Sequence, residues 1–290
     1  MIISVGEIVW DIFGDKKVLG GAPLNVAYHL SKLGHDITLI SRVGSDNLAS
    51  DTLAKITDLG IPTHSIQQDD ILPTGQVKVT LGNDNEPSFD IVAPAAWDAI
   101  DGSSLDWCKD KKYNLIFGSL AQRSAKSRAT IRSLWNRAGT IFYDVNLRPP
   151  FTPTEVVVES LAAAHVVKLN DKELHTVADW LKVPPGNLQG RAQNLFSLYN
   201  WMALTVTLGE SGAFVVSKDG LFEHPGFPVK VIDTVGAGDA FFAAFIDSVL
   251  NNRDWPACLD AANSRGAYVA GCQGATPSMD DFSPQNFNAK

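Results

Sequence analysis

The chain has 290 residues, of which 45% are hydrophobic and 19% charged, so it can bury a sizeable core and is expected to form one large α/β domain with at most a small appendage. A formal net charge of -8 argues against a broad electropositive surface, so neither nucleic acid nor an anionic membrane is expected as a main partner. The three cysteines, Cys108, Cys258 and Cys272, lack CxxC spacing and a nearby histidine pattern, which predicts buried small apolar side chains rather than disulfides or a zinc site.

The N-terminal residues MIISVGEIVWDIFG place an apolar strand directly after Met1. No basic leader or long apolar region precedes it, which excludes an ordinary secretory signal. No apolar run in the sequence is long enough to cross a bilayer. The sequence therefore predicts a cytoplasmic protein.

Short apolar runs with high β-propensity recur along the chain and predict buried strands. Stretches with helical spacing lie between them, such as 25–33 and 129–138. This alternation is typical of a doubly wound α/β fold, a mostly parallel sheet wrapped by helices. The expected strands are 2–5, 37–40, 115–118, 140–145, 166–169 and 203–208.

Residues 75–91 break this rhythm, because they alternate with period two around a turn-rich NDNEP centre, as a hairpin does. The segment is too short to fold alone. We expect it to form a small β lid within a single domain of residues 1–290, with the lid spanning roughly 8–19 and 75–97. Exposed lid edges often pair with a second subunit, so a homodimer through the lid is an open alternative.

The segment VIDTVGAGDAFFAAFIDSVL carries the most chemistry. An apolar strand is expected to end near Asp233, a tight turn to follow at 236–238, and a helix to begin at Asp239 or Ala240. Small residues in the turn let several backbone N–H groups converge where the positive end of the helix dipole points. The sequence therefore predicts a pocket for an anion or for a transition-state charge.

Asp239 stands at the mouth of this pocket, where a carboxylate can remove the proton of an attacking hydroxyl while the N–H groups stabilise phosphoryl oxygens. A helix N-terminus should lower the carboxylate pKa and weaken the base, although a loose transition state asks little of the base until late. The structural alternative is that Asp239 only caps the helix and the glycines only form a turn. The segment matches neither GxxxxGK[ST] nor GxGxxG, which argues against a P-loop and against a dinucleotide-dependent oxidoreductase.

Two long motifs resemble the signatures of one family. DTVGAGDAFFAAF at 233–245 resembles the C-terminal signature of the ribokinase-like (PfkB) carbohydrate kinases, and GGAPLNVAYHLSKLG at 20–34 resembles their N-terminal signature. The resemblance covers nearly the whole chain, because it extends through four further segments: DVNLRPPF at 144–151, LNDKE at 169–173, TLGESGA at 207–213 and GCQGATPS at 271–278.

The resemblance implies an enzyme that uses ATP to phosphorylate a small sugar, in a doubly wound α/β domain whose lid closes over the sugar. It marks Asp239 as the catalytic base and Gly236, Ala237 and Gly238 as the anion hole. Closure suits this chemistry, because water competes with the sugar as the nucleophile and a closed lid excludes it.

The same resemblance implies that Asp11, Gly21 and Asn25 hold sugar hydroxyls, and that Asn146 and Arg148 reach substrate or phosphate. The structural alternatives are local. Asp11 would then cap a turn, Asn25 would cap the following helix, and Arg148 would be an exposed loop charge before two prolines.

Asn170 and Glu173 match the NxxE element of the family, which is thought to order Mg²⁺ and its waters beside the phosphates. Outer-sphere ligands are reasonable because Mg²⁺ keeps much of its hydration shell. A capping box fits the same spacing and is compatible with that role. The resemblance implies that four further positions form the nucleotide site, the last of them near the adenine: Thr207, Gly209, Gly212 and Asn263.

Some relatives bind a monovalent cation beside the anion hole through backbone carbonyls, which leave no side-chain pattern. The resemblance therefore leaves a K⁺ site open here. The matching positions are Asp233, Val235, Val269, Cys272, Gly274 and Ser278.

The form GGAP followed by LNVA looks like the fructokinase version of the N-terminal motif, and 73–98 looks like a fructokinase lid. Phe89, Ala95 and Trp97 are available there to flank a sugar, although Trp97 could equally pack the lid hinge. Ribose, 2-keto-3-deoxygluconate and nucleosides stay open as acceptors, because a few hydrogen bonds decide specificity. A sensor that binds sugar or nucleotide without turnover is the alternative from another class, and the intact GAGD segment argues against it.

Overall fold

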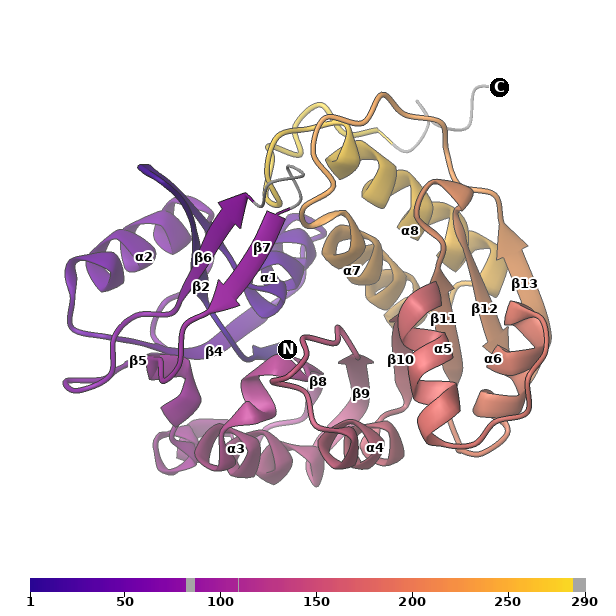
Figure 1. Cartoon of the computed structure of the whole chain (residues 1–290), viewed down its shortest axis with the longest axis horizontal. Helices are drawn as coiled ribbons and strands as arrows, with labels where there is room; N and C mark the ends of the chain where they lie inside the picture. The colour runs from indigo at the N-terminus through magenta and orange to yellow at the C-terminus, as the bar shows by residue number, and fades with distance from the viewer. Residues whose placement is uncertain (82–86, 109, 284–290) are drawn as a thin grey trace.

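The computed structural model describes residues 1–81, 87–108 and 110–283, without the side chains of 79–81 and 87–89. These residues form a nine-stranded sheet with helices on both faces and a separate four-stranded sheet (Figure 1). The doubly wound α/β prediction is therefore confirmed. Phe89, expected beside the sugar, is one of the side chains outside this description.

All six predicted apolar runs are strands of the main sheet. Neighbours from β11 to β5 run parallel, and β12 and β13 add an antiparallel edge. In spatial order the strands are β13 (Gly220–His224), β12 (Ala213–Ser217), β11 (Ala203–Thr207), β10 (Val166–Asn170), β9 (Ala138–Asp144), β8 (Tyr113–Gly118), β1 (Ile2–Val5), β4 (Ile37–Val43) and β5 (Ile66–Gln68).

Each face of the sheet has its own apolar cluster, because successive side chains of a strand point to opposite faces. Val167 and Leu169 of β10 join one cluster, whereas Val166 joins the other. Four helices cover the face of Val166: α1 (Ala22–Lys32), α2 (Asn47–Asp58), α7 (Ala237–Leu250) and α8 (Trp255–Ala270). The opposite face carries α3 (Ala125–Trp135), α4 (Thr154–Ala163), α5 (Asp171–Trp180) and α6 (Leu188–Phe196).

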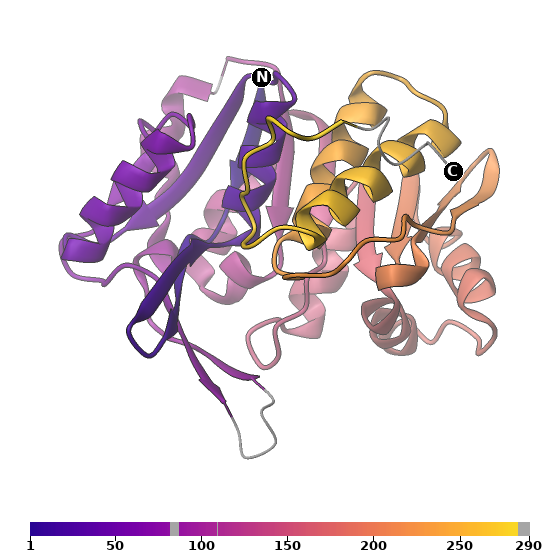
Figure 2. The same ribbon diagram turned by 90° about the horizontal axis from the view of Figure 1, so that it is seen from above.

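The small sheet joins the two segments that the sequence predicted as a lid. Its strands, in spatial order, are β3 (Lys16–Gly20), β2 (Val9–Phe13), β6 (Gln76–Leu81) and β7 (Pro87–Ile91). The segments meet because β2 pairs with β6 in parallel, with Asp11 opposite Val77. The sheet projects away from the main body (Figure 2). Its last strand ends at Ile91, short of the expected boundary at residue 97.

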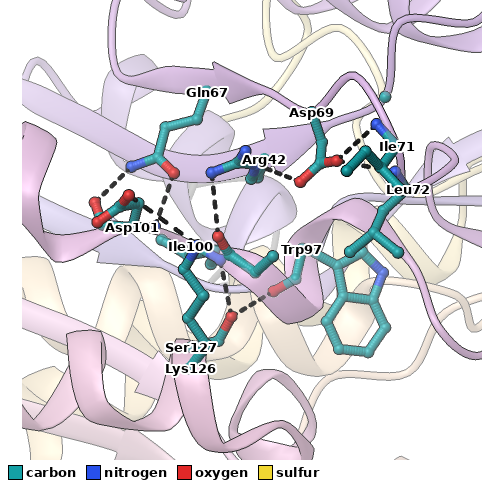
Figure 3. Close-up of polar contacts among 12 residues, drawn as sticks. Arg42, Gln67, Asp69, Ile71, Leu72, Trp97, Ile100, Asp101, Lys126 and Ser127 are labelled. Carbon is teal, nitrogen blue, oxygen red and sulfur yellow. Dashed lines mark hydrogen bonds and ion pairs between the residues drawn. The ribbon is translucent and has the colours of Figure 1, made fainter.

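Polar contacts tie the connections of this lid to the main sheet (Figure 3). Arg42 of β4 lies 2.8 Å from the carboxylate of Asp69, which precedes the lid strand β6. Ser127 of α3 donates to the backbone carbonyl of Trp97, which follows the lid strand β7. Both connections are therefore anchored to elements of the main body.

Trp97 packs the hinge of the lid rather than a sugar. Its side chain is fully buried, with 0% exposure, and Ala95 beside it is 1% exposed. The guanidinium of Arg123 lies 3.9 Å from the centre of the Trp97 ring and also bonds Asp98. Neither Trp97 nor Ala95 has a surface free to flank a sugar, so the hinge alternative holds.

The segment before the glycine turn is not the strand that its apolar residues predict. Residues 225–235 have no regular secondary structure, and Val231 and Ile232 are 56% and 63% exposed. The segment crosses to the end of α8, where Ile232 donates its N–H to the carbonyl of Ala270, instead of extending the sheet beyond β13. Helix α7 begins at Ala237, before the expected start at Asp239 or Ala240.

Cys108 and Cys258 are buried as predicted, whereas Cys272 is half-buried in the loop after α8. All three are free thiols. Among the helices of the described residues, none combines the length and the apolar character needed to span a bilayer.

Candidate active site

The glycine turn lies at the N-terminus of α7. Gly236 has a φ of 78°, a left-handed conformation, and a Cβ added to it would lie 2.3 Å from the Cβ of Ala275. Both the left-handed φ and this close contact exclude a side chain at Gly236. The backbone at Ala275 therefore packs directly against the turn. The first amides of a helix have no acceptor within it, which makes the N–H groups of Gly238 and Asp239 suitable for binding an anion. The N–H of Ala237, also predicted for the anion hole, instead donates to the carbonyl of Thr234 at 3.3 Å.

Asp239 lies beside this turn and is held from α1. The side-chain amide of Asn25 donates a hydrogen bond of 2.8 Å to Asp239 Oδ2. The two residues are 214 positions apart, and α1 packs along α7. This single contact therefore joins the N-terminal and the C-terminal motif into one site.

The environment of Asp239 makes its carboxylate a better base than its place in the sequence suggests. Burial, reinforced by the nearby carboxylate of Asp144, raises the pKa of Asp239 from 3.8 to about 6, while Lys168, Asn25 and Arg148 act in the opposite direction. The expectation of a lowered pKa is therefore wrong, because removal from water outweighs the helix N-terminus.

The residues predicted to hold the sugar gather beneath the lid. Gly21 has a φ of 117°, and a Cβ there would lie 2.4 Å from the carbonyl oxygen of Glu7, so only glycine allows the chain to pass. Gly21 is also the N-cap of α1, so Asn25 is free for Asp239 and the capping alternative for Asn25 is wrong. Burial raises the pKa of half-buried Asp11, and the charge of exposed Arg148 opposes this rise, so the two groups are near enough to interact.

Asn146 is not joined to this group. It lies half-buried in the loop after β9 with a φ of 38°, a conformation that asparagine tolerates. Within the described residues, no hydrogen bond links its side chain to Asp11, Asn25 or Asp239. Its role stays a prediction.

Asn170 and Glu173 form the capping box that their spacing allows. Asn170 Oδ1 accepts from the Glu173 N–H at 2.8 Å, and Glu173 Oε2 accepts from the Asn170 N–H at 2.9 Å. Glu173 Oε1 accepts from the N–H of Leu147 and so fixes the loop after β9. Burial raises the pKa of Glu173, while Lys168 opposes the rise. Each carboxylate oxygen accepts one bond and keeps a lone pair, which fits a role in holding metal-bound water.

The four residues predicted for the nucleotide line one cleft of about 780 Å³. Ala237 and Gly238 of the glycine turn also line it, so the cleft adjoins the turn predicted as the anion hole. Asn263 donates its amide N–H to Leu259, which leaves its side-chain oxygen as the group facing a ligand. Apolar residues of the loop 225–235, among them Phe227, Val229 and Val231, line one side of the cleft.

Five of the six positions predicted for a monovalent cation lie in the loops before α7 and after α8, and Val269 lies in the last turn of α8. Asp233 joins these loops, because its carboxylate accepts from the N–H groups of Val235 and Gly274, both at 3.0 Å. At the other positions, the carbonyl of Val269 accepts from Cys272, and the carbonyl of Ser278 accepts from the hydroxyl of Tyr268.

The sequence interpretation missed three ionisable groups near Asp239. Lys168 and Asp144 form a buried ion pair, and Glu7 is 4% exposed with its Oε2 unpartnered among the described residues. Burial raises the pKa of Glu7 to about 7. A charged residue inside or directly after an apolar strand is the signal that could have identified all three, since such residues are rarely buried without a reason.

A small sheet beside the main one, a cleft of about 780 Å³ and a carboxylate beside a glycine turn are parts that a small-molecule kinase needs. The fold matches fructokinase from Vibrio cholerae O395, solved with fructose, ADP and a calcium ion, with a TM-score of 0.84 at 25% identity over 99% of this chain and 98% of that one. It also matches a sugar kinase from Pyrococcus horikoshii, solved with ATP, with a TM-score of 0.82 at 26% identity over 99% of both chains.

In sequence, the chain is 28% identical to the ATP-dependent ribose-1-phosphate kinase of Halopiger xanaduensis, over 94% of this chain and 93% of that one. The family model of the pfkB family carbohydrate kinases matches residues 5–281, and the chain belongs to that family. The resemblance inferred from the two motifs is therefore confirmed.

Proposed function

We propose that this sugar kinase transfers the γ-phosphoryl group of ATP to a hydroxyl of a ketose, with fructose as the preferred acceptor. The observation that carries the proposal is the position of Asp239. Asn25 donates to its carboxylate at 2.8 Å, and Asp239 directly follows Gly238, which lines the cleft proposed for the nucleotide. A relative of the same fold, the Vibrio fructokinase, binds fructose and ADP.

In the proposed reaction the sugar hydroxyl attacks the γ-phosphorus. A bond forms between the hydroxyl oxygen and phosphorus, the bond from phosphorus to the β,γ-bridging oxygen breaks, and ADP leaves. Asp239 takes the hydroxyl proton, while the N–H groups of Gly238 and Asp239 stabilise the charge of the transferring group. Asp11, Gly21 and Asn25 orient the sugar, and the lid excludes water from the reacting atoms.

Asn170 and Glu173 would hold Mg²⁺ through its water ligands in this proposal. The metal ion supplies charge neutralisation to the phosphates of ATP. The two side chains suit an outer-sphere role, because the capping box fixes their oxygens while each Glu173 oxygen still keeps a lone pair.

The raised pKa of Asp239 predicts the acid side of the pH profile. A base must be ionised, so kcat/KM is expected to fall about tenfold per pH unit once the pH drops below about 6, the pKa to which burial raises Asp239. Initial rates of ADP release between pH 4.5 and 8, at subsaturating sugar, would measure this limb. A flat profile over that range would remove Asp239 from the role of base.

The charges around the sugar side favour a neutral acceptor. Glu7, Asp11 and Asp239 are three carboxyl groups, and the charge of exposed Arg148 acts on each of them. Lys168, the other cation that acts on Asp239, is already paired with Asp144. A phosphate or carboxylate on the acceptor would add a like charge among these groups and bind less well.

An ADP-release screen tests this preference directly. It compares fructose, other ketoses, ribose, ribose 1-phosphate, 2-keto-3-deoxygluconate and nucleosides. We expect the highest kcat/KM for a neutral ketose, with anionic acceptors lower by roughly tenfold or more. A higher kcat/KM for ribose 1-phosphate or for the keto acid would contradict the proposed substrate class.

A monovalent cation beside the anion hole is part of the proposal. The carboxylate of Asp233 holds the loops of Val235 and Gly274 together, and backbone carbonyls of such loops suit K⁺. A form of the Vibrio fructokinase is known with potassium bound. We expect turnover to rise roughly fivefold or more when K⁺ replaces tetramethylammonium at equal ionic strength. Equal rates in the two salts would argue against the site.

Two expectations from the sequence stay predictions. Pairing of two chains through the lid would use the outer strands β3 and β7, whose edges lack a neighbouring strand among the described residues. The second expectation that stays a prediction is a cytoplasmic location.

A further inference from the structure

A buried ion pair lies beneath the glycine turn, on the face of the sheet that α7 covers. Lys168 of β10 and Asp144 of β9 stand directly opposite each other in the parallel ladder. Lys168 Nζ lies 2.8 and 3.0 Å from the two carboxylate oxygens of Asp144. The side chains are 9% and 5% exposed, so water hardly reaches either charge.

Apolar side chains pack around this Lys168–Asp144 pair, and Glu173 and Asp239 are further carboxylates whose charges act on Lys168. Phe142 and Val166, two residues earlier on the same strands, belong to the apolar cluster beneath α1, α7 and α8. Lys168 Nζ lies 6.0 Å from the centre of the Phe242 ring. A buried ion pair is often no more stabilising than apolar side chains of similar volume, because the loss of hydration offsets the attraction. Packing alone therefore does not explain these two charges.

The ammonium group of the pair lies directly under the first turn of α7. A Cβ added to Gly238 would lie 3.6 Å from Lys168 Nζ. A positive charge is unfavourable for the helix itself, whose N-terminus is already positive. The same place is favourable for an anion in the glycine turn, because the ammonium charge and the helix dipole then act together.

We propose that Lys168, held in place by Asp144, is a positioning residue for phosphoryl transfer, whose ammonium strengthens the glycine turn as an anion hole and balances the charge around Asp239. The inference rests on the proposed function, because it takes Asp239 as the base and the turn as the place of the transferring group. Neither Lys168 nor Asp144 lines the nucleotide cleft. Both therefore act through the turn and through Asp239.

The two members of the pair act on Asp239 with opposite sign. Beyond the effect of burial, Asp144 raises the pKa of Asp239, whereas Lys168 lowers it. A purely structural role would predict that removal of either partner disturbs the site in the same way. The groups that face Asp239 are Asn25 of α1, Glu7 after β1, Asp144 at the end of β9, Arg148 in the following loop and Lys168 of β10.

The test compares Lys168→Met, Asp144→Asn and the double variant with the wild-type enzyme. The double variant is essential, because each single change leaves one buried charge without its partner and strongly destabilises the protein. The matched control is the exposed pair Lys126 and Asp101, 4.0 Å apart and far from the turn in the fold, changed to Met and Asn together. Thermal unfolding confirms that each variant is folded.

Two readouts are measured. The first is the pH at which kcat/KM for the sugar falls on the acid side. Lys168→Met is expected to move this limb to higher pH and Asp144→Asn to lower pH, each by about one unit. The second is the affinity for ATP relative to ADP, measured by calorimetry without sugar. The double variant is expected to lose this preference about tenfold and to lower kcat about 100-fold, while the control pair changes neither.

Three results would overturn the inference. The acid limbs of kcat/KM in the two single variants could move in the same direction, or they could stay in place. The third result is a folded double variant with wild-type kcat and a wild-type preference for ATP. Failure of the proposed function is recognised separately. If the wild-type enzyme turns over no ketose while the double variant still loses the preference for ATP, the proposed substrate is refuted and the role of Lys168 is retained.

Discussion

Asp239→Asn is expected to lower kcat by about 1000-fold, because a positioned general base contributes between about 10² and 10⁴ in rate. The amide oxygen of the new side chain can still accept the hydrogen bond that Asn25 now donates to Asp239 at 2.8 Å. Ligand binding should therefore change little. Turnover is measured as ADP release with fructose at pH 8, and binding of sugar and ATP by calorimetry.

The matched control is Asp247→Asn on the same helix, where the carboxylate bonds His35 at 2.9 Å instead of facing the cleft. It should keep kcat within about twofold. Unchanged turnover in Asp239→Asn would remove this carboxylate from catalysis. A wild-type protein that binds sugar and nucleotide without releasing ADP would instead support the sensor alternative.

The same substitution has a consequence for stability. Burial raises the pKa of Asp239 above its unfolded value, to about 6, so the ionised form is disfavoured in the folded protein. The stabilising contribution of this group is therefore present below pH 3.8 and lost as the pH rises through about 6. At pH 8 the variant Asp239→Asn should consequently melt at a higher temperature than the wild type, although it is nearly inactive.

Gly236→Ala is expected to lower kcat by about 10²- to 10³-fold, the effect of losing an oxyanion-hole donor. The new Cβ would lie 2.3 Å from the Cβ of Ala275 and 2.5 Å from its Cα, so the turn and the backbone behind it must separate. The left-handed φ of 78° adds strain of about 1–2 kcal/mol. Initial rates and urea unfolding measure the two effects.

The control variant Gly60→Ala separates the effect of backbone strain from the effect of close packing against Ala275. Gly60 has nearly the same backbone conformation, with a φ of 80°, but a Cβ there meets nothing within 4 Å. It should lose about 1 kcal/mol of stability from strain and keep full kcat. Equal losses of kcat in both variants, or full activity in Gly236→Ala, would show that close packing against Ala275 does not shape the anion hole.

The elements of the main sheet could be predicted because their signal is local. The runs at 2–5 and 203–208 are apolar, β-rich and bounded by turns, and they became β1 and β11. The apolar residues Val231 and Ile232 give a similar local signal and are exposed in a loop. Their position depends on the end of α8 and the nucleotide cleft, which no window of the sequence contains.

The candidate site also has a part that follows from the local sequence and a part that depends on distant segments. The glycine turn and Asp239 form one continuous segment, so their juxtaposition follows from chain connectivity, and the resemblance to the family added Asn25. Lys168 and Asp144 are 24 residues apart and meet only because β9 and β10 pair in one particular register. A shift of β10 by one residue would turn Lys168 to the other face of the sheet, away from Asp144.

The sequence by itself determined the alternation of strands and helices, the glycine turn with its carboxylate, and the carbohydrate kinase family to which the chain belongs. Only the tertiary structure decided that Trp97 packs the hinge and that an ion pair lies beneath the turn. It also decided that the pKa of Asp239 is raised rather than lowered. Burial and pairing depend on which distant segments come together, and desolvation and charge act over those contacts rather than along the chain.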